Sequence, residues 1–436
     1  MKTDVSNLGQ GPGLAWKRGT SSFPPGSLAE LQEWTGGKTD PPEPPWHGEL
    51  TFQQWNTIGW AITDDGILCI KPWKGDTGET GSVTDYNGAP WYNQRSKIKK
   101  VESIGDIVLN ASSTYLLYGC SNLTDLTALA NWDVSNVTNM RSTFSGCSSL
   151  TDLTALKNWD VSNVTNMTSI FQGCSDLTDL TPLEHWSVSK VTSMNYMFNG
   201  CSSLTDLTAL ANWNVSNVWS MNGMFQSCYN LTDLTALANW TVSNVTYMKS
   251  IFQGCSDLTD LTALANWNVS NVTDISNMFS SCSSLTDLTA LANWNVSNVT
   301  YISNMFQGCS DLTDLTALAN WNVSNVTYMS GMFQSCYNLT DLTALANWNV
   351  SNVEIMDFMF QGCSSLQRIG IPSIANGGQN LVENAEAAKL TTVLPSIVSE
   401  DGSMGPYTWD ELYTEMTPNP DAFQDGTVWV KAEEAE

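Results

Sequence analysis

Residues 309–335 read CSDLTDLTALANWNVSNVTYMSGMFQS, and close copies of this stretch follow one another from Cys120 to Cys363 with no insertion or deletion. Ten of the 11 cysteines keep a step of 27 residues, and nine tryptophans keep the same step from Trp132 to Trp348. Such a period is typical of a solenoid, in which one coil cannot bury its apolar side chains alone and stacked coils bury them together. The sequence therefore predicts nine stacked coils.

The first half of each coil has the alternation of a short strand. In the quoted copy, Asp314 and Thr316 are expected to point to one side, and Leu315 with Ala317 to the other. The polar pair should form a wet face. Stacking then places the strands of successive coils in a parallel sheet, with a step of about 4.8 Å per coil.

The second half has the spacing of a short helix. Met329, Met332, Phe333 and Cys336 lie at i, i+3, i+4 and i+7, and Thr327 is placed as a helix N-cap. The predicted fold class is an α/β repeat solenoid. It is a curved array with parallel strands inside and short helices outside, flanked by small α+β segments, and the tryptophan column packs between its coils.

The repeat NW-x-VSNVT-x-M-x-x-MF-x-GC resembles the leucine-rich repeats of bacterial surface proteins of the BspA-like group. The resemblance covers residues 120–363, and DDGILCI at 64–70 with the segment 83–101 resembles the lead-in to such arrays, which extends it to about residue 64. It implies a leucine-rich-repeat-like solenoid. It also implies a non-enzymatic surface or secreted protein that adheres to host molecules or to other cells.

Composition divides the chain into four segments. Residues 1–63 form a Pro/Gly/Trp-rich arm or linker, and residues 64–119 form the N-terminal cap of the array. Residues 120–370 are the nine-coil solenoid, and residues 371–436 are an acidic α+β attachment segment.

Both end segments carry features that predict contacts. Lys97, Lys99 and Lys100 form a basic patch that is expected to dock on the acidic array or on a neighbouring subunit. Thr408 and Glu411 form a capping box for a short helix. Asp425-Gly426 is expected to turn into a strand over 427–430, and a mini-core or a handle for homo-oligomer assembly is expected from Trp409, Tyr413, Phe423 and Trp429.

The charge balance excludes some partners. The chain has 17 Lys and Arg against 43 Asp and Glu, a net charge of −26, so its surface repels nucleic acid and anionic membranes. No apolar run is long enough to cross a bilayer, and no secretory signal is visible. The expected location is therefore extracellular, on a cell surface or on a virion, and a phage particle released by lysis is favoured because it needs no signal.

Residues that could carry chemistry are sparse. The two histidines, His47 and His185, lie in unrelated contexts and allow no catalytic triad or zinc site. Ten equivalent thiols in one column have no unique pairing, so reduced, buried cysteines are expected. The sequence predicts no enzyme, no cofactor and no metal, with calcium left open.

Two sets of residues are candidates for binding. The first is a ladder of carboxylates and hydroxyls on the concave face, which is read either as a solvated face with local hydrogen bonds or as a site for cations or for a cationic or sugar ligand. Its central members are Asp206, Thr208, Asp233, Thr235, Asp260, Thr262, Asp287, Thr289, Asp314 and Thr316.

The second set lies at variable positions between the members of the predicted helical stripe. Tyr, Asn, Ser, Gly and Asp dominate there, as on adaptable recognition surfaces, although unconstrained drift gives the same pattern. Its tyrosines are Tyr196, Tyr247, Tyr301 and Tyr328. The expected partner is a protein or glycan on a cell surface. The alternative is an architectural or decorating subunit whose contacts are protein–protein only.

Overall fold

The structure is a computed structural model. It describes residues 50–83, 85, 87–372, 377–401, 403–416 and 427–432. The chain divides into two units at Gly48, and the second unit, Glu49–Glu436, contains the repeat array. The expected arm lies outside the described residues up to residue 49, and so do Phe423 and the expected turn at Asp425-Gly426.

A small sheet begins the second unit. Strands β1 (Gln53–Trp55), β2 (Ile58–Ile62) and β3 (Ile67–Pro72) are antiparallel, and β5 (Lys100–Ser103) pairs in parallel with β3. A 3-10 helix, η1, covers Tyr92–Lys97, and a parallel pair is formed by β4 (Thr77–Glu79) and β6 (Asp106–Val108). Because β1 and β2 belong to this sheet, the expected arm boundary at residue 63 is wrong. The N-terminal cap begins about ten residues earlier, at Gln53.

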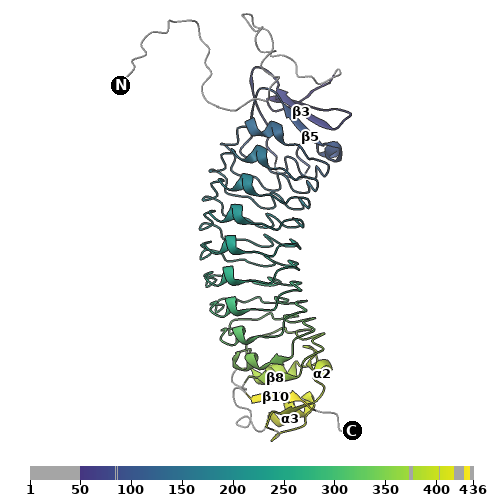
Figure 1. The fold of residues 1–436 in the computed structure, drawn as a ribbon, viewed down its shortest axis with the longest axis vertical. Helices are drawn as coiled ribbons and strands as arrows, with labels where there is room; N and C mark the ends of the chain where they lie inside the picture. The colour runs from purple at the N-terminus through teal and green to yellow at the C-terminus, as the bar shows by residue number, and fades with distance from the viewer. Residues whose placement is uncertain are drawn as a thin grey trace, which may run out of the picture. The chain divides into compact units, whose positions relative to one another are not determined.

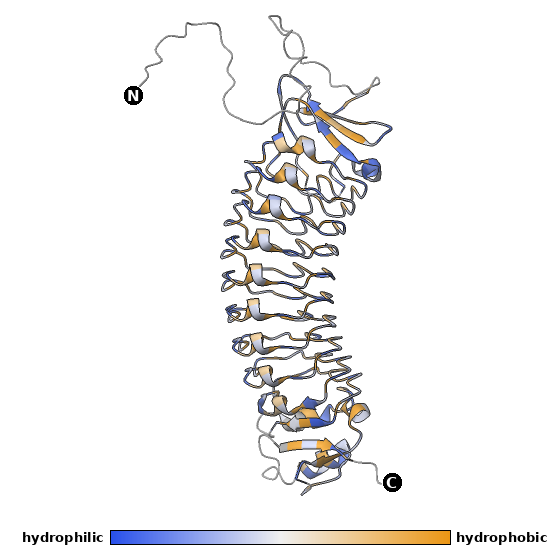
Figure 2. Ribbon diagram, in the orientation of Figure 1, coloured by the Kyte–Doolittle hydropathy of each residue, from blue (hydrophilic) through white to orange (hydrophobic). Residues whose placement is uncertain are grey.

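The repeats stack as successive coils, each containing one short 3-10 turn (Figure 1). Along each coil hydrophobic and hydrophilic residues alternate (Figure 2). The turns, which all begin at a threonine, are η2 (Thr127–Asn131), η3 (Thr154–Leu156), η4 (Thr181–Leu183), η5 (Thr208–Leu210), η6 (Thr235–Leu237), η7 (Thr262–Leu264), η8 (Thr289–Leu291), η9 (Thr316–Leu318) and η10 (Thr343–Asn347). This architecture confirms the predicted repeat solenoid of the leucine-rich-repeat type.

The predicted strand around Leu315 is wrong. The Thr316 N–H donates to Asp314 Oδ1 (2.7 Å), and this local bond turns the chain into η9. The parallel bridges between coils lie elsewhere, at the residue after the VSNVT motif, where Tyr301 pairs with Tyr328 and the same column continues through every coil. Leu315 is buried and Asp314 is exposed as predicted, because a turn and a strand can present the same residues to solvent.

The predicted helical stripe is buried but is not a helix. Met329, Met332, Phe333 and Cys336 are 0% exposed. In the equivalent segment of the preceding coil, the N–H groups of residues 304, 306 and 308 donate to carbonyls of residues 330, 332 and 334 in the next coil (2.8, 3.0 and 2.7 Å). An α-helix needs those donors for carbonyls of its own turn, so stacking excludes it.

The predicted N-cap at Thr327 is wrong for the same reason. No helix starts there, and the Thr327 N–H donates to the Thr300 carbonyl of the preceding coil (3.0 Å). Two left-handed positions shape the segment in its place, as at Asn304 (φ 58°) and Gly308 (φ 72°). Glycine, serine and asparagine dominate these positions, and glycine and asparagine tolerate this conformation better than other residues.

Three columns of side chains hold the coils together. Phenylalanine rings stack through all nine coils, with centroids 5.6–6.0 Å apart and planes 4–11° apart, from Phe144 to Phe360. Each tryptophan that keeps the 27-residue step, from Trp159 to Trp348, donates its indole N–H to a leucine carbonyl of the preceding coil (2.9–3.1 Å). All 11 cysteines are free and buried, which confirms the expectation of packed thiols.

The C-terminal segment closes the array. Strand β7 (Asp341–Leu342) pairs with β8 (Arg368–Ile371), and β10 (Thr427–Lys431) lies between β8 and β9 (Ile397–Ser399). Three helices accompany the sheet: α1 (Gly378–Glu383), α2 (Leu390–Val393) and α3 (Trp409–Met416). Among the described residues, no helix has the length and apolar character needed to cross a bilayer.

The predicted elements of this segment are confirmed. Helix α3 begins at the expected capping box, in which the Thr408 N–H donates to Glu411 Oε2 (2.8 Å) and the Glu411 N–H donates to Thr408 Oγ1 (3.3 Å). The expected strand is β10. Trp409 and Trp429 are buried, and Tyr413 packs against the core.

The tryptophan ladder predicts a specific loss of stability. Trp240→Phe removes the indole donor to the Leu210 carbonyl (3.0 Å), which keeps only the Trp213 N–H (3.1 Å), so we expect the free energy of unfolding to fall by about 0.5–1.5 kcal/mol. Trp219→Phe is the matched control, because Trp219 is exposed. Urea unfolding followed by circular dichroism compares the two variants. Equal losses in both would contradict the ladder's role.

Candidate binding face

One surface of the array differs from coil to coil. We call it the bridge face, and it consists of residues 138–142 and the equivalent five residues of each later coil, ending at 354–358. The parallel bridges run along it, from Asn139 and Asn166 to Tyr328 and Ile355. Between the bridges the buried columns hardly change, whereas the outward side chains of the bridge face include small polar, charged and aromatic residues. The bridge face is therefore the part of each coil that stacking leaves free to vary.

Aromatic side chains gather on the bridge face. Of the predicted tyrosines, Tyr196, Tyr247 and Tyr301 are exposed, and Tyr328 is half-buried with its ring stacked on that of Tyr301 (5.0 Å, 14°). Their role in binding a ligand stays a prediction.

The sequence prediction missed Trp219, whose ring is 47% exposed and lies edge-on to Tyr247 with centroids 5.9 Å apart. The signal was present, because Trp219 replaces the threonine that ends the VSNVT motif in most other coils.

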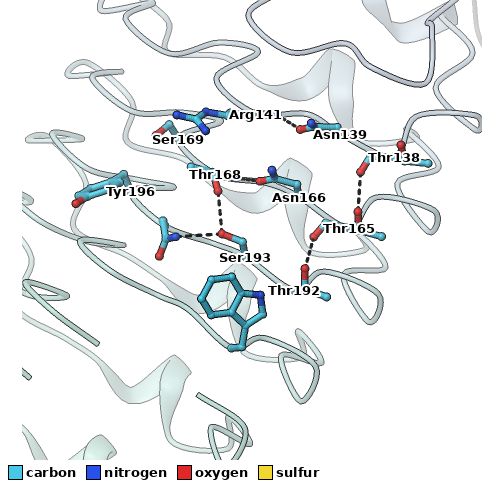
Figure 3. A pocket seen from close by; sticks show the side chains of 12 residues that line it. Thr138, Asn139, Arg141, Thr165, Asn166, Thr168, Ser169, Thr192, Ser193 and Tyr196 are labelled. Atoms are coloured by element: carbon cyan, nitrogen blue, oxygen red, sulfur yellow. Dashed lines mark hydrogen bonds between the residues drawn. The ribbon is translucent and has the colours of Figure 1, made fainter. Parts of the chain in front are cut away.

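A groove of about 650 Å³ lies on the bridge face across four coils. This volume is within the range of small-ligand sites. Figure 3 shows Thr138, Thr165 and Thr192 in a row along one side, with Arg141 and Tyr196 on the other. The lining residues are Thr138, Asn139, Arg141, Thr165, Asn166, Thr168, Ser169, Thr192, Ser193, Asn195, Tyr196 and Trp219. The groove is lined by hydroxyls and amides, two aromatic rings and one cation, with no carboxylate.

Hydrogen bonds fix the floor of the groove. The hydroxyls of Thr165 and Thr192 donate to backbone carbonyls one coil earlier (3.2 and 3.1 Å), which leaves their oxygen lone pairs as acceptors. Ser193 Oγ accepts from the Asn195 amide (3.2 Å) and shares a hydrogen bond with the Thr168 hydroxyl (2.9 Å). Because these side chains are held by neighbours in their own or an adjacent coil, their hydrogen-bonding groups are oriented without a ligand.

The Tyr196 ring is held by the adjacent coil. Tyr196 has a left-handed backbone (φ 56°) at a position where most other coils have serine, asparagine or glycine. Its ring fills the space beside Gly223, where a Cβ atom would lie 2.4 Å from the ring Cδ1. A bulky residue in this conformation costs about 1–2 kcal/mol, so the chain accepts strain to place this ring.

Arg141 supplies the only charge among the groove's lining residues. Its side chain is exposed, and its guanidinium lies 6.0 Å from the centroid of the Tyr115 ring. Within the described part of the chain, the guanidinium forms no ion pair. A positive charge is therefore available at the groove of a chain whose net charge is −26.

The predicted aspartate ladder lies at the 3-10 turns, away from this groove. Oδ1 of every aspartate in the column accepts the N–H of the threonine two residues later (2.7–2.8 Å). The structure thus confirms local hydrogen bonding to a carboxylate that stays in solvent. A further role in binding cations or sugars stays a prediction. In the described residues, no three His, Cys, Asp or Glu side chains are grouped closely enough to hold a metal ion.

Both ends of the aspartate ladder meet a cation. Lys100 of the predicted basic patch pairs with Asp125 (3.4 Å) and Glu102 (3.0 Å), so this lysine contacts the acidic column, and docking of the whole patch stays a prediction. At the other end Arg368 pairs with Asp341 (3.3 Å) and Glu400 (2.6 Å). The end segments therefore oppose the charge of the terminal carboxylates.

The stacked coils, each closed by a 3-10 turn, define a leucine-rich-repeat solenoid with a polar, aromatic-walled groove. The sequence matches the family described as "Mycoplasma protein of unknown function, DUF285" over residues 112–233, 204–313 and 286–373, which together span more than half of the chain. The chain belongs to this family, and the BspA-like leucine-rich-repeat assignment is confirmed. A comparison with curated protein sequences gave no match.

Three of the solved structures that the chain matches are of bacterial proteins. A leucine rich cell surface protein from Faecalibacterium prausnitzii is 16% identical, with 73% of this chain and 87% of that chain covered and a TM-score of 0.33. A leucine-rich repeat protein from Eubacterium ventriosum is 18% identical (74% and 92% covered, TM-score 0.32). An internalin from Listeria monocytogenes is 17% identical (63% and 80% covered, TM-score 0.23).

The aspartate turns predict a pH dependence. Hydrogen bonds from the Thr208 hydroxyl (2.6 Å) and N–H (2.7 Å) lower the pKa of Asp206 below its ordinary value, so folding favours the ionised form. Its contribution to stability is complete above pH about 4 and is lost as the pH falls through the lowered pKa. Asp206→Asn keeps the turn without a titrating group. In urea unfolding, we expect wild type to lose stability relative to this variant below pH 4, and a difference independent of pH would refute the assignment.

Proposed function

We propose that this protein is a non-enzymatic recognition or adhesion protein that binds a ligand on a cell or host surface through the bridge face. The observation that carries the proposal is the exposure of large aromatic side chains on this face, where most copies of the repeat carry small polar residues. Exposed aromatic rings lend binding surfaces a large contact area at a small entropic cost. The stacking of the coils needs none of them.

Backbone strain supports the same conclusion. Tyr196 and Phe358 both hold exposed rings on left-handed backbone (φ 56° and 59°), at positions that serine, asparagine or glycine occupy in most coils. Glycine or asparagine at these positions lowers the cost of the left-handed backbone, and several other coils carry one of them. The presence of large exposed rings at such strained positions supports a recognition role for this face.

The chemistry of the buried groups supports a non-enzymatic role. Burial raises the pKa of Cys174, Cys228 and Cys309 to about 12, so these thiols stay protonated at neutral pH and are poor nucleophiles. His185 is exposed at the edge of a turn, and His47 lies outside the described residues.

The proposed location is the outside of a cell, where an adhesive surface meets its ligand. The expected preference for a phage particle is not supported by the comparisons. Assembly through the terminal segments stays a prediction, and the C-terminal tryptophans expected to serve as a handle are buried in the closing segment.

Paired variants test the proposal. Trp219→Ala/Tyr247→Ala removes a pair of exposed rings from the bridge face, whereas Tyr229→Ala/Tyr337→Ala removes two equally exposed rings (50% and 51%) from outside it. Labelled full-length protein is applied to an array of extracellular-matrix proteins and glycans. We expect wild type to bind, the first variant to bind at least tenfold more weakly, and the second to bind as wild type does.

Two outcomes would overturn the proposal. If both variants lose binding affinity equally, the ligand does not bind specifically to the bridge face. No binding by wild type to any matrix protein, glycan or intact cell would favour the architectural alternative, in which the array is a spacer. Melting temperatures of all three proteins, measured in parallel, separate lost contacts from lost folding.

A further inference from the structure

The charge of the groove differs from that of the whole chain. Of the lining residues none is acidic and one, Arg141, is a cation, although the chain carries a net charge of −26. Later coils of the bridge face do carry carboxylates, among them Asp274, Glu354 and Asp357. A groove free of carboxylates on such a chain, with one unpaired guanidinium beside it, favours a ligand that carries an isolated negative charge. Arg binds a carboxylate through two parallel hydrogen bonds.

The floor offers donors and acceptors in alternation. The Oδ1 atoms of Asn139 and Asn166 accept backbone N–H groups of their own coils (3.1 and 2.9 Å), which fixes the amide planes. Within the described residues, their Nδ2 groups have no hydrogen-bond partner, so they are oriented donors. The neighbouring threonine hydroxyls present acceptors. This alternation complements a ligand rich in hydroxyl groups, each of which both donates and accepts.

Two aromatic rings from successive coils form part of the groove walls. Tyr196, braced against Gly223, and Trp219 both line the groove. The face of an aromatic ring is negative, so it attracts the positively polarised C–H groups on the flat side of a sugar ring. The coils that carry Arg141 and Tyr196 are two steps apart in the stack, a distance of about 10 Å at about 4.8 Å per step. One small sugar cannot reach both, but a short chain of sugars can.

From these observations we infer that the groove binds a short oligosaccharide that contains a carboxylated sugar. The carboxylate pairs with Arg141, a neighbouring pyranose ring stacks on Tyr196 or Trp219, and the hydroxyls bond to the threonine and asparagine floor. This inference rests on the proposed function and names its ligand class. The carboxylate belongs to a uronic acid or to a sialic acid, since the groove chemistry fits both.

Calorimetric titration of the full-length protein tests the inference with defined probes. The uronate probe is a hyaluronan tetrasaccharide, the sialate probe is 3′-sialyllactose, and lactose and chitotetraose are neutral controls. A hexaglutamate peptide represents the other class of acidic ligand. We expect one carboxylated saccharide to bind at least tenfold more tightly than the neutral ones and than the peptide, and which one binds identifies the source of the carboxylate.

Two exposed cations form a matched pair of variants. Arg141→Gln should weaken binding of the carboxylated saccharide at least tenfold, because it removes the charge and keeps a polar side chain. Lys249→Gln removes a cation from the same column of the bridge face, outside the groove, and should leave binding unchanged. Tyr196→Ala should also weaken binding. An unchanged melting temperature of this variant shows that the repeat array is still folded.

Each contrary result has a definite meaning. Equal binding of neutral and carboxylated saccharides, or no effect of Arg141→Gln, overturns the role of the charge. Tighter binding of hexaglutamate assigns the groove to acidic peptides and overturns the saccharide inference. A third result separates the two proposals. If none of these saccharides binds, but the Trp219→Ala/Tyr247→Ala variant still binds more weakly than wild type to the matrix proteins and glycans tested above, the saccharide inference fails and the proposed recognition role stands.

Discussion

A coil of this protein cannot satisfy its own backbone. Alternate N–H groups of the segment from residue 302 to 308 point out of the coil and donate to carbonyls of the next one, and the indole of each tryptophan donates back to the coil before it. An unpaired buried N–H or carbonyl is costly, so each coil depends on a neighbour of the same length and register. This dependence accounts for nine copies without an insertion. One extra residue would shift every donor away from its acceptor.

The same dependence explains the end segments. At the N-terminal end, β5 and β6 accept the first coil through parallel bridges, and Ser103 Oγ takes the indole N–H of Trp132 (3.0 Å) that a leucine carbonyl takes elsewhere. At the C-terminal end, the carbonyls of residues 387 and 388 accept the N–H groups of Phe358 and Phe360 (2.7 and 3.0 Å), as a tenth coil would. The two end segments thus cover the apolar side chains of the terminal coils and also supply hydrogen-bond acceptors at the positions where a neighbouring coil would supply them.

The period and the buried columns could be predicted from the sequence, because they depend only on spacing and hydrophobicity. The elements within a coil could not. Met329, Met332 and Phe333 have the spacing of a helical face, and a chain of turns with two left-handed residues buries the same side chains. Local spacing cannot tell whether an N–H bonds within its coil or to the next. The one hint was the recurrence of Gly, Ser or Asn at the positions of Asn304 and Gly308.

The site was predicted in part. The sequence grouped Tyr196 and Tyr247 on one outer surface but missed Trp219, which the bridges bring onto the same face. Their contacts cross from coil to coil, so a ring can be added only where the neighbour makes room, as Gly223 does for Tyr196. Specificity on such an array therefore changes by pairs of positions 27 residues apart. The buried columns, bound by register, stay fixed while the bridge face varies, so one scaffold can present many surfaces without a change in its core.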